Sequence, residues 1–172
     1  MTPDTPDPRL TAADQSILLT ACSTALLTLV PVAAHQTGLL HHLPDPPAPI
    51  FASDRITGSA LAHPLGIPDS LLGLASYSIT FALILLARRR RPILGIPARH
   101  LLAAKLLFDA TAATYNATRQ LTRFRKLCSW CTATALATAA MVVAGRHTIA
   151  SSARTLTGRP HPLATPALNR LP

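Results

Sequence analysis

The stretch Arg125-Lys126-Leu127-Cys128-Ser129-Trp130-Cys131-Thr132-Ala133-Thr134 places a Cys-x-x-Cys pair between two cations and a long run of small apolar residues. If that run is a helix, Cys128 lies at its N-terminus, where free backbone N–H groups and the helix dipole favour a thiolate. The thiolate is the form of cysteine that exchanges disulfides. Because the spacing also puts the two sulfurs one helical turn apart, close enough to form a disulfide, the stretch predicts a redox-active pair with Cys128 as the reactive thiol.

The composition of the whole chain is that of a membrane protein. Of the 172 residues, 49% are hydrophobic and only 13% are charged, which is about half the usual charged share of a soluble domain. The apolar residues gather into runs of about 20, the length that crosses a bilayer. We therefore expect an all-α fold, an integral membrane four-helix bundle in contact with lipid, formed by one domain over residues 14–147.

Each part of that domain follows from the apolar runs and the polar stretches between them. The expected spans are residues 16–34, 66–87, 99–122 and 128–144, with a long external loop at 35–65. Residues 1–13 and 148–172 are rich in proline and have no apolar period, so we expect both to be disordered cytoplasmic tails.

The net charge of +9 comes from cations that cluster at the ends of the apolar runs, where membrane proteins carry their topology signals. No nucleic-acid-binding motif is visible, so we expect no nucleic acid as partner. The run Arg88-Arg89-Arg90-Arg91 is the strongest cytoplasmic signal in the chain. This orientation predicts a multi-pass protein of the plasma (inner) membrane, with the cysteine pair at the oxidising external face.

The third expected span contains an acid and a base four residues apart. Lys105 and Asp109 form an i, i+4 pair, and charges inside a bilayer are tolerated only where they are paired and face the bundle interior. Two interpretations stay open, a structural ion pair and a role near a redox centre. Cys22, in the first span, is interpreted as a small buried hydrophobic residue.

Two stretches together resemble the vitamin K epoxide reductase (VKOR) family. One is Leu65-Gly66-Ile67-Pro68-Asp69-Ser70-Leu71-Leu72-Gly73, which is similar to the start of the family's second helix. The other is Cys128-Ser129-Trp130-Cys131, which opens the last core helix. The resemblance covers residues 14–146, and it implies a four-helix bundle that holds a quinone, ubiquinone or menaquinone, against the cysteine pair.

The resemblance also implies roles for single residues. Cys131 corresponds to the cysteine that faces the quinone, and Cys128 to the one that exchanges with a thiol donor. The residue before the serine of the first motif helps to bind a quinone carbonyl in the family; it is asparagine in some members and Asp69 here. The candidate quinone-binding residues are Asp69, Ser70, Tyr77 and Tyr115. Arg125 and Lys126 are the candidates for stabilising the thiolate.

The chain departs from the family in its external loop. Family members usually carry a second cysteine pair there, which shuttles electrons to the Cys-x-x-Cys pair, whereas residues 35–65 contain no cysteine. An ungapped alignment back from Gly66 puts Ser53 at the second loop cysteine and Ser59 on the loop's characteristic serine. No thioredoxin-like domain is expected after the bundle. A separate thioredoxin-like protein would therefore have to attack the disulfide directly.

We accordingly expect a membrane thiol–disulfide oxidoreductase, active in disulfide-bond formation, that passes electrons from a dithiol partner through Cys128 and Cys131 to a quinone. The alternative is a non-catalytic membrane protein that binds a quinone or lipid and has lost the shuttle cysteines. An inert, merely packed cysteine pair is a further alternative. A zinc site would need the cysteine pair together with loop histidines. These are His41, His42 and His63, whose spacing does not support such a site, so we expect no metal.

Overall fold

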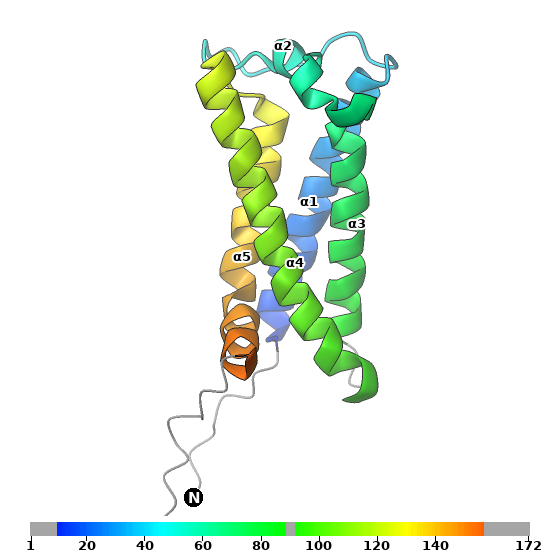
Figure 1. Ribbon diagram of the computed structural model, residues 1–172, viewed down its shortest axis with the longest axis vertical. Helices are drawn as coiled ribbons and strands as arrows, with labels where there is room; N and C mark the ends of the chain where they lie inside the picture. Colours follow the sequence, from blue (N-terminus) through cyan, green and yellow to red (C-terminus); the bar gives the residue numbers. More distant parts are fainter. Residues whose placement is uncertain (1–9, 89–91, 157–172) are drawn as a thin grey trace, which may run out of the picture.

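The computed structural model describes residues 10–88 and 92–156, and the regular elements of that part are helices. Four of these helices are long and lie side by side (Figure 1). They are α1 (Ala12–Gln36), α3 (Asp69–Arg88), α4 (Pro92–Arg119) and α5 (Ser129–Leu156). The prediction of an all-α fold is therefore confirmed.

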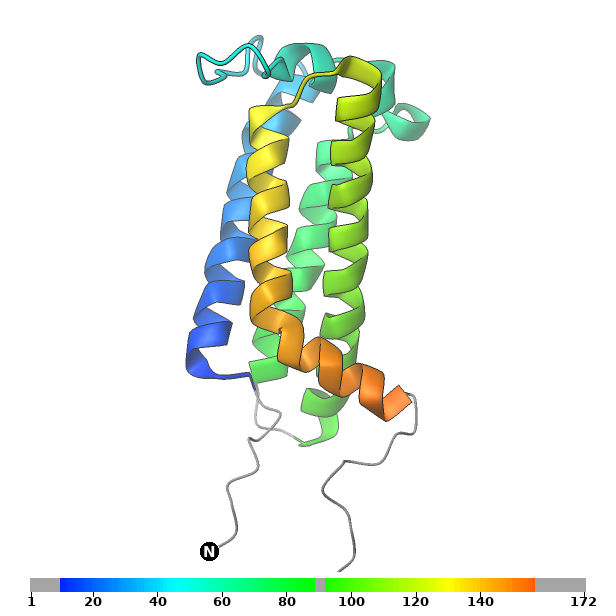
Figure 2. The same ribbon diagram turned by 90° about the vertical axis from the view of Figure 1, so that its left-hand side faces the viewer.

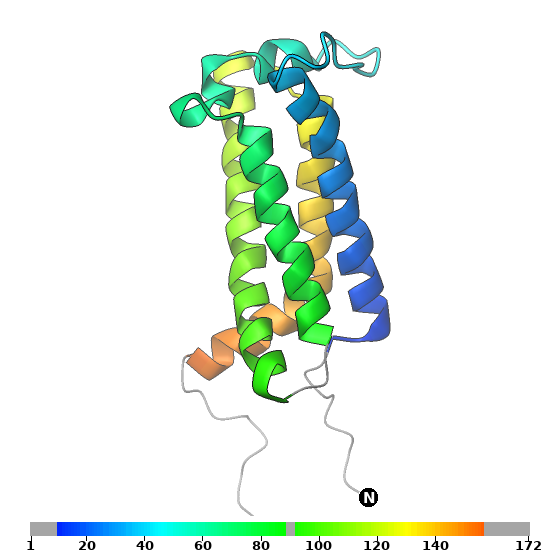
Figure 3. The ribbon, with the colours of Figure 1, turned by 90° about the vertical axis from the view of Figure 1, so that its right-hand side faces the viewer.

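The long helices surround one apolar core. Helix α1 packs on α3 and α5, and α4 packs on the same two helices from the other side, an arrangement that Figures 2 and 3 show from two directions. Leu18, Ile84, Leu102, Leu106 and Met141 bring all four helices into this core and are completely buried. Close packing of such side chains holds the helices together, in a bilayer as well as in water.

Two of the long helices have the length and hydropathy of a bilayer span. They are Ala12–Gln36 and Asp69–Ala87. Among the described residues, α4 and α5 do not reach the same hydropathy, because threonines and ionisable residues interrupt their apolar runs. The spans expected at 99–122 and 128–144 therefore stay predictions, although both segments are helical over most of their length.

Several helix boundaries differ from those expected. Helix α1 begins at Ala12, inside the expected tail 1–13, and α5 continues to Leu156, so residues 148–156 of the second expected tail are helical. The extension of α5 packs against the bundle, since Thr148 is 1% exposed and His100 Nδ1 lies 3.0 Å from Ser152 Oγ. The rest of both tails, 1–9 and 157–172, and residues 89–91 of the arginine run lie outside the described residues.

The expected loop 35–65 lies across one end of the bundle (Figure 1). It contains three short helices, α2 (Ser53–Thr57), η1 (Ala60–Ala62) and η2 (Pro64–Gly66). Before α2, the Ala52 N–H donates to Leu127 O at 3.0 Å, and the Leu127 N–H donates to Ile50 O at 2.9 Å. Residues 43–53, which we call the cap segment, are thereby fixed against the residue that precedes Cys128.

Candidate active site

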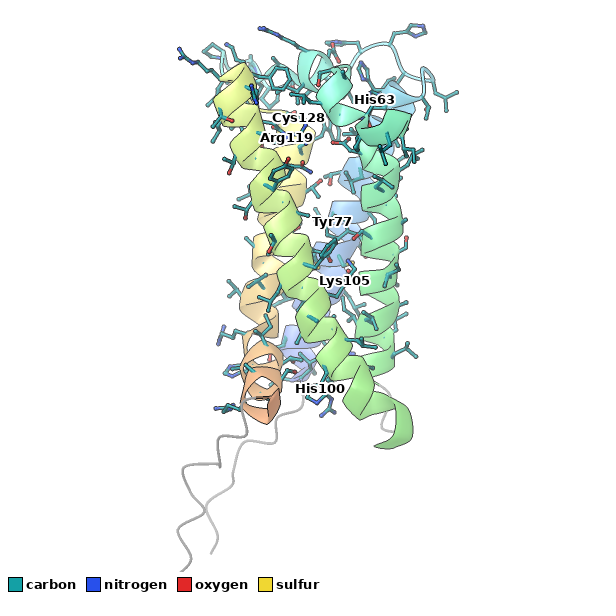
Figure 4. The ribbon with its side chains drawn as sticks, viewed as in Figure 1. His63, Tyr77, His100, Lys105, Arg119 and Cys128 are labelled. Atoms are coloured by element: carbon teal, nitrogen blue, oxygen red, sulfur yellow. The ribbon has the colours of Figure 1, made fainter. Side chains whose placement is uncertain are left out.

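Cys128 and Cys131 lie at the capped end of the bundle, where α5 begins (Figure 4). The first hydrogen bond of α5 runs from the Thr132 N–H to Cys128 O at 2.9 Å, so Cys128 occupies the helix N-terminus, as predicted. The Cys131 N–H donates to Cys128 Sγ at 3.2 Å. Both thiols are free in this structure. A backbone N–H aimed at the sulfur and the positive end of the helix dipole favour a thiolate at Cys128.

A carboxylate of the cap segment binds the first turn of α5, next to Cys128. Asp45 Oδ1 accepts hydrogen bonds from the hydroxyls of Ser53 and Ser129, each at 2.6 Å, and Asp45 Oδ2 accepts one from the Ser53 N–H at 2.7 Å. Burial raises the pKa of Asp45, but the hydrogen bonds from Ser129 and Ser53 outweigh burial and hold that pKa below its ordinary value. An ionised Asp45 therefore ties the cap segment to the first turn of α5 at neutral pH, and Cys128 is 0% exposed beneath it.

Two further contacts fix the cap segment. The Trp130 indole N–H donates to Pro44 O at 3.1 Å, and the Lys126 ammonium donates to Pro49 O. Lys126 is thus engaged by the cap segment, while Arg125 is exposed in a left-handed conformation with φ at 51°. The structure places both cations close to Cys128 in the chain, and their role in stabilising the thiolate stays a prediction.

One buried polar side chain binds the backbone of Cys128, and the sequence analysis missed it. Gln120 begins the π-helix η3 (Gln120–Phe124) and is 8% exposed. Its Oε1 accepts a hydrogen bond from the Cys128 N–H at 2.9 Å. The available signal was indirect: a helix N-terminus that is buried needs an acceptor for its free N–H groups.

A cleft opens beside Gln120, between the end of α4 and the short helices of the loop. Its polar lining is Asp69, Asn116, Arg119 and Gln120, and its apolar lining includes Ile56, Leu61 and Phe124. Such a lining is found in sites for small organic ligands, but the empty volume here is about 280 Å³, part of it open solvent, and such sites usually have about 300–1,000 Å³. Because Gln120 also binds the Cys128 N–H, the cleft lies near the start of α5.

The four candidate quinone residues are not brought together in one place. Asp69 lines the cleft and accepts a hydrogen bond from Gln36 Nε2 at 2.8 Å, and the neighbouring Ser70 is buried with its hydroxyl on Gln36 Oε1. Tyr77 lies deeper in the bundle than Cys128 (Figure 4), and its hydroxyl is 2.6 Å from Thr138 Oγ1. Tyr115 is 61% exposed.

Tyr115 faces outward, and the Arg119 guanidinium lies 5.2 Å from the centre of its ring. The structure therefore places Asp69 at the cleft and Ser70 directly behind it, whereas Tyr77 and Tyr115 lie elsewhere. The quinone-binding roles of all four residues stay predictions.

Two of the loop histidines, His42 and His63, contact protein groups. His42 Nδ1 pairs with Asp54 Oδ2, and His63 Nδ1 lies 3.0 Å from Ser59 O. Within residues 10–88 and 92–156, no three side chains of histidine, cysteine or carboxylate type gather as metal ligands.

A family model supports the resemblance of the two motifs. The model described as the vitamin K epoxide reductase family matches residues 16–145. The match begins in α1 and ends in α5, so it includes the cap segment, the cleft residues and both cysteines of the pair. Comparison with curated proteins gives no match.

Proposed function

Because the chain belongs to the vitamin K epoxide reductase family, whose members are membrane-embedded oxidoreductases that act on quinones, we propose that it is a quinone-dependent thiol–disulfide oxidoreductase. In this proposal, electrons pass from a dithiol partner protein through Cys128 and Cys131 to a quinone bound in the cleft. The observation that carries the proposal is the position of Cys128 at the N-terminus of α5, with the Cys131 N–H on its sulfur.

The proposed reaction starts from the Cys128–Cys131 disulfide. A partner thiolate attacks Cys128 Sγ, which forms a mixed disulfide and releases Cys131 as a thiolate. The second thiol of the partner then attacks the mixed disulfide, so the partner leaves oxidised and the Cys128–Cys131 pair is left reduced. Two electrons and two protons of that pair pass to the quinone, which becomes a quinol as the disulfide forms again. The net result is a new disulfide in the partner.

The burial of Cys128 bears on how a partner reaches it. Its side chain is 0% exposed under the cap segment, so direct attack requires that segment to move aside. The bonds that hold the segment are the hydrogen bonds of Asp45, Trp130 and Lys126, the Ser129 N–H bond to Ser53 Oγ, and the two backbone bonds to Leu127. Each such bond contributes about 1 kcal/mol net. A partner that binds at this end of the bundle can displace them.

The remaining details of the proposal follow the sequence analysis. The protein spans the plasma (inner) membrane four times, with the cysteine pair at the external face. The quinone is ubiquinone or menaquinone, bound with help from Asp69 and Ser70 and, less directly, from Tyr77 and Tyr115. The donor is a separate thioredoxin-like protein.

The experiment is quinone reduction by the purified protein in detergent, with dithiothreitol as donor. We expect turnover in the wild type and none in Cys131→Ala or Cys128→Ala, since either change removes the disulfide. Cys22→Ala is the matched control, because Cys22 is fully buried in the core with its Sγ 3.4 Å from Tyr77 O. It should retain turnover.

The absence of loop cysteines favours one alternative, a non-catalytic protein that binds a quinone or lipid. That alternative predicts a wild-type protein that binds ubiquinone, as measured by equilibrium dialysis, without reducing it. This result would refute the proposed enzyme activity and support the binding protein.

A further inference from the structure

We propose that the exposed arginines near Cys128 form a docking surface for the dithiol partner, which therefore carries acidic side chains beside its reactive cysteine. The inference rests on the function proposed above and deepens it, since it names the chemistry of the partner that the same site accepts. Its test needs only the thiol of Cys128 and no quinone, so the two proposals can fail separately.

The capped end of the bundle carries more cations than carboxylates. Residues 37–69 and 116–131 contain three aspartates, Asp45, Asp54 and Asp69, and five cations, Arg55, Arg119, Arg123, Arg125 and Lys126. Cations at an external end oppose the orientation that Arg88-Arg89-Arg90-Arg91 predicts, because positive charge favours the cytoplasmic side. The cations of this end therefore need a reason other than topology.

The three aspartates are engaged within the protein. Asp45 binds the first turn of α5, as described above. Asp54 accepts a hydrogen bond from the Leu43 N–H at 2.7 Å, and Asp69 accepts one from Gln36 Nε2 at 2.8 Å. In the part of the chain that the structure describes, none of the three forms a salt bridge with an arginine or a lysine. The positive charge of this end is therefore not neutralised there.

Three of the cations are exposed and free. Within residues 10–88 and 92–156, the side chains of Arg55, Arg123 and Arg125 have no salt bridge and no hydrogen bond. Arg119 differs, since its guanidinium donates to Leu61 O at 2.9 Å. An arginine presents its N–H donors in a planar fork that matches a carboxylate. The three free arginines therefore suit carboxylates that another molecule brings.

These arginines belong to segments that meet at Cys128. Arg55 lies in α2, whose first residue accepts a hydrogen bond from the Ser129 N–H at 3.0 Å. Arg123 lies in η3, whose first residue accepts one from the Cys128 N–H at 2.9 Å, and Arg125 follows η3 directly. Helix α2 lies across the end of the bundle (Figure 1), not along the sides that would face lipid. This placement favours a protein partner over phospholipid headgroups.

Docking of a carboxylate also helps to uncover the thiol. Cys128 is buried, and one of the bonds that hold the cap segment runs from the Lys126 ammonium to Pro49 O. A carboxylate binds an ammonium more strongly than a neutral carbonyl oxygen does. A partner carboxylate at Lys126 therefore competes with Pro49 O, and release of the cap segment gives access to Cys128.

The test measures how fast charged peptides react with Cys128 in the full chain. The parent protein carries Cys22→Ala and Cys131→Ala, which leave Cys128 as the single cysteine. Each peptide has one cysteine, activated as a 2-pyridyl disulfide and flanked by glutamates, lysines or glutamines. The Cys128 thiolate attacks the peptide sulfur and forms a mixed disulfide. Pyridine-2-thione leaves with the electron pair of the broken bond, takes up a proton and is measured by its absorbance.

At low salt, we expect the glutamate peptide to react about tenfold faster than the glutamine peptide, since complementary charge raises association rates. The lysine peptide should be the slowest. The preference should vanish in about 1 M salt, where the Debye length is about 3 Å. Arg55→Gln and Arg123→Gln should each lower the ratio of the glutamate to the glutamine rate about two- to threefold. The ratio cancels any change in the reactivity of the thiol itself.

Arg146→Gln makes the same change at the far end of the bundle, where Arg146 is also exposed, and it should leave the ratio unchanged. Equal rates for the glutamate and glutamine peptides would overturn the proposal, as would a preference that neither Arg55→Gln nor Arg123→Gln reduces. If one variant does not fold, as judged by thermal unfolding, the other decides. Arginines that bind phospholipid headgroups would instead give no preference among the peptides, and the parent protein would retain more phosphatidylglycerol on purification than the variants. That result also overturns the proposal.

Quinone turnover with dithiothreitol, measured on the wild type, separates this inference from the proposed function. A preference for the glutamate peptide without turnover would leave the docking surface in place and refute the proposed function. Turnover without a preference would do the reverse.

Discussion

Ser53 Oγ accepts a hydrogen bond from the backbone N–H of Ser129 at 3.0 Å, although 76 residues separate the two in the chain. The bond puts Ser53 next to the residue that follows Cys128. The sequence resemblance had assigned residue 53 to the second shuttle cysteine of the loop. The structure thus places a serine, at the position that the resemblance gives to a shuttle cysteine, at the start of the helix that carries the cysteine pair.

The first prediction is that a cysteine at position 53, in Ser53→Cys, can form a disulfide with Cys128. In a Cys131→Ala background, where Cys128 has no other partner nearby, we expect mild oxidation to join residues 53 and 128 by a disulfide. The bond would be detected as a linked peptide by mass spectrometry without reduction. Ser59→Cys in the same background is the control, because the Ser59 hydroxyl bonds to Ile56 O. Equal or greater cross-linking in the control would contradict the placement of the cap segment.

The second prediction concerns pH and the attachment of the cap segment. The pKa of Asp45 is held below its ordinary value by hydrogen bonds from Ser129 and Ser53, against the effect of burial. A carboxyl with a lowered pKa in the folded state stabilises that state above its ordinary pKa, about 4. This contribution is lost as the pH falls through the lowered value. We therefore expect the cap segment to detach below about pH 4.

Trp130 reports this event, because it is the single tryptophan of the chain and its indole N–H binds Pro44 O. The wild type should show a change in tryptophan fluorescence in the acid range, and Asp45→Asn should show part of that change already at pH 7. Asp14→Asn, at the other end of the bundle, is the control. The pKa of Asp54 is also lowered, since hydrogen bonds from the Leu43 N–H and His42 outweigh burial. The Asp45→Asn variant therefore shows which of the two carboxyls causes the fluorescence change. Identical fluorescence of Asp45→Asn and wild type would argue against the attachment.

The third prediction separates two roles of Lys126. As a stabiliser of the thiolate, it would lose that effect in Lys126→Met, and Cys128 would react more slowly. As a tie to Pro49 O, it would release the cap segment, and Cys128 would become more accessible. The observed contact leads us to expect faster labelling of Cys128 by a bulky maleimide at pH 7. Arg125→Gln, which removes a neighbouring exposed charge, is the comparison, and slower labelling in Lys126→Met would favour the thiolate role.

The sequence analysis predicted the elements well because their signals are local. The apolar runs mark α1 and α3, and the cations followed by Cys128 and Cys131 mark the start of α5. Contacts between distant residues were not predictable in this way. Asp45 and Ser129 are 84 residues apart, and nothing in the pattern of either segment indicates that they meet. Gln120 was missed for the same reason, since its bond to the Cys128 N–H depends on a π-helix and a turn that bring it back to Cys128.

The end of α5 differs from the expected one for another reason. The expected last span ends at residue 144, and the residues that follow it, Gly145-Arg146-His147, are of types typical of helix C-termini. The helix continues because tertiary packing outweighs this local preference. Gly145 is needed for that packing, since a Cβ there would lie 2.5 Å from Cδ1 of the buried Leu106.

The Lys105–Asp109 pair is the site of the last prediction. Asp109 is 2% exposed, and it accepts hydrogen bonds from Ser76 Oγ at 2.9 Å and Thr80 Oγ1 at 2.6 Å. The Lys105 ammonium contacts Asp109 and donates to the same two hydroxyls at 2.8 and 3.0 Å. The pair therefore joins α4 to α3. It lies deeper in the bundle than Cys128 (Figure 4). This position favours a structural ion pair over a role near the redox centre.

We expect Lys105→Met or Asp109→Leu alone to destabilise the protein by about 3–5 kcal/mol, because each leaves one buried charge without its partner. The double variant should lose less than the sum of the two, since it leaves no charge behind. Thermal unfolding in detergent measures both effects. Quinone turnover per folded molecule then decides the role: a structural pair predicts that the folded double variant retains turnover, whereas a pair that serves the redox centre predicts a folded but inactive protein.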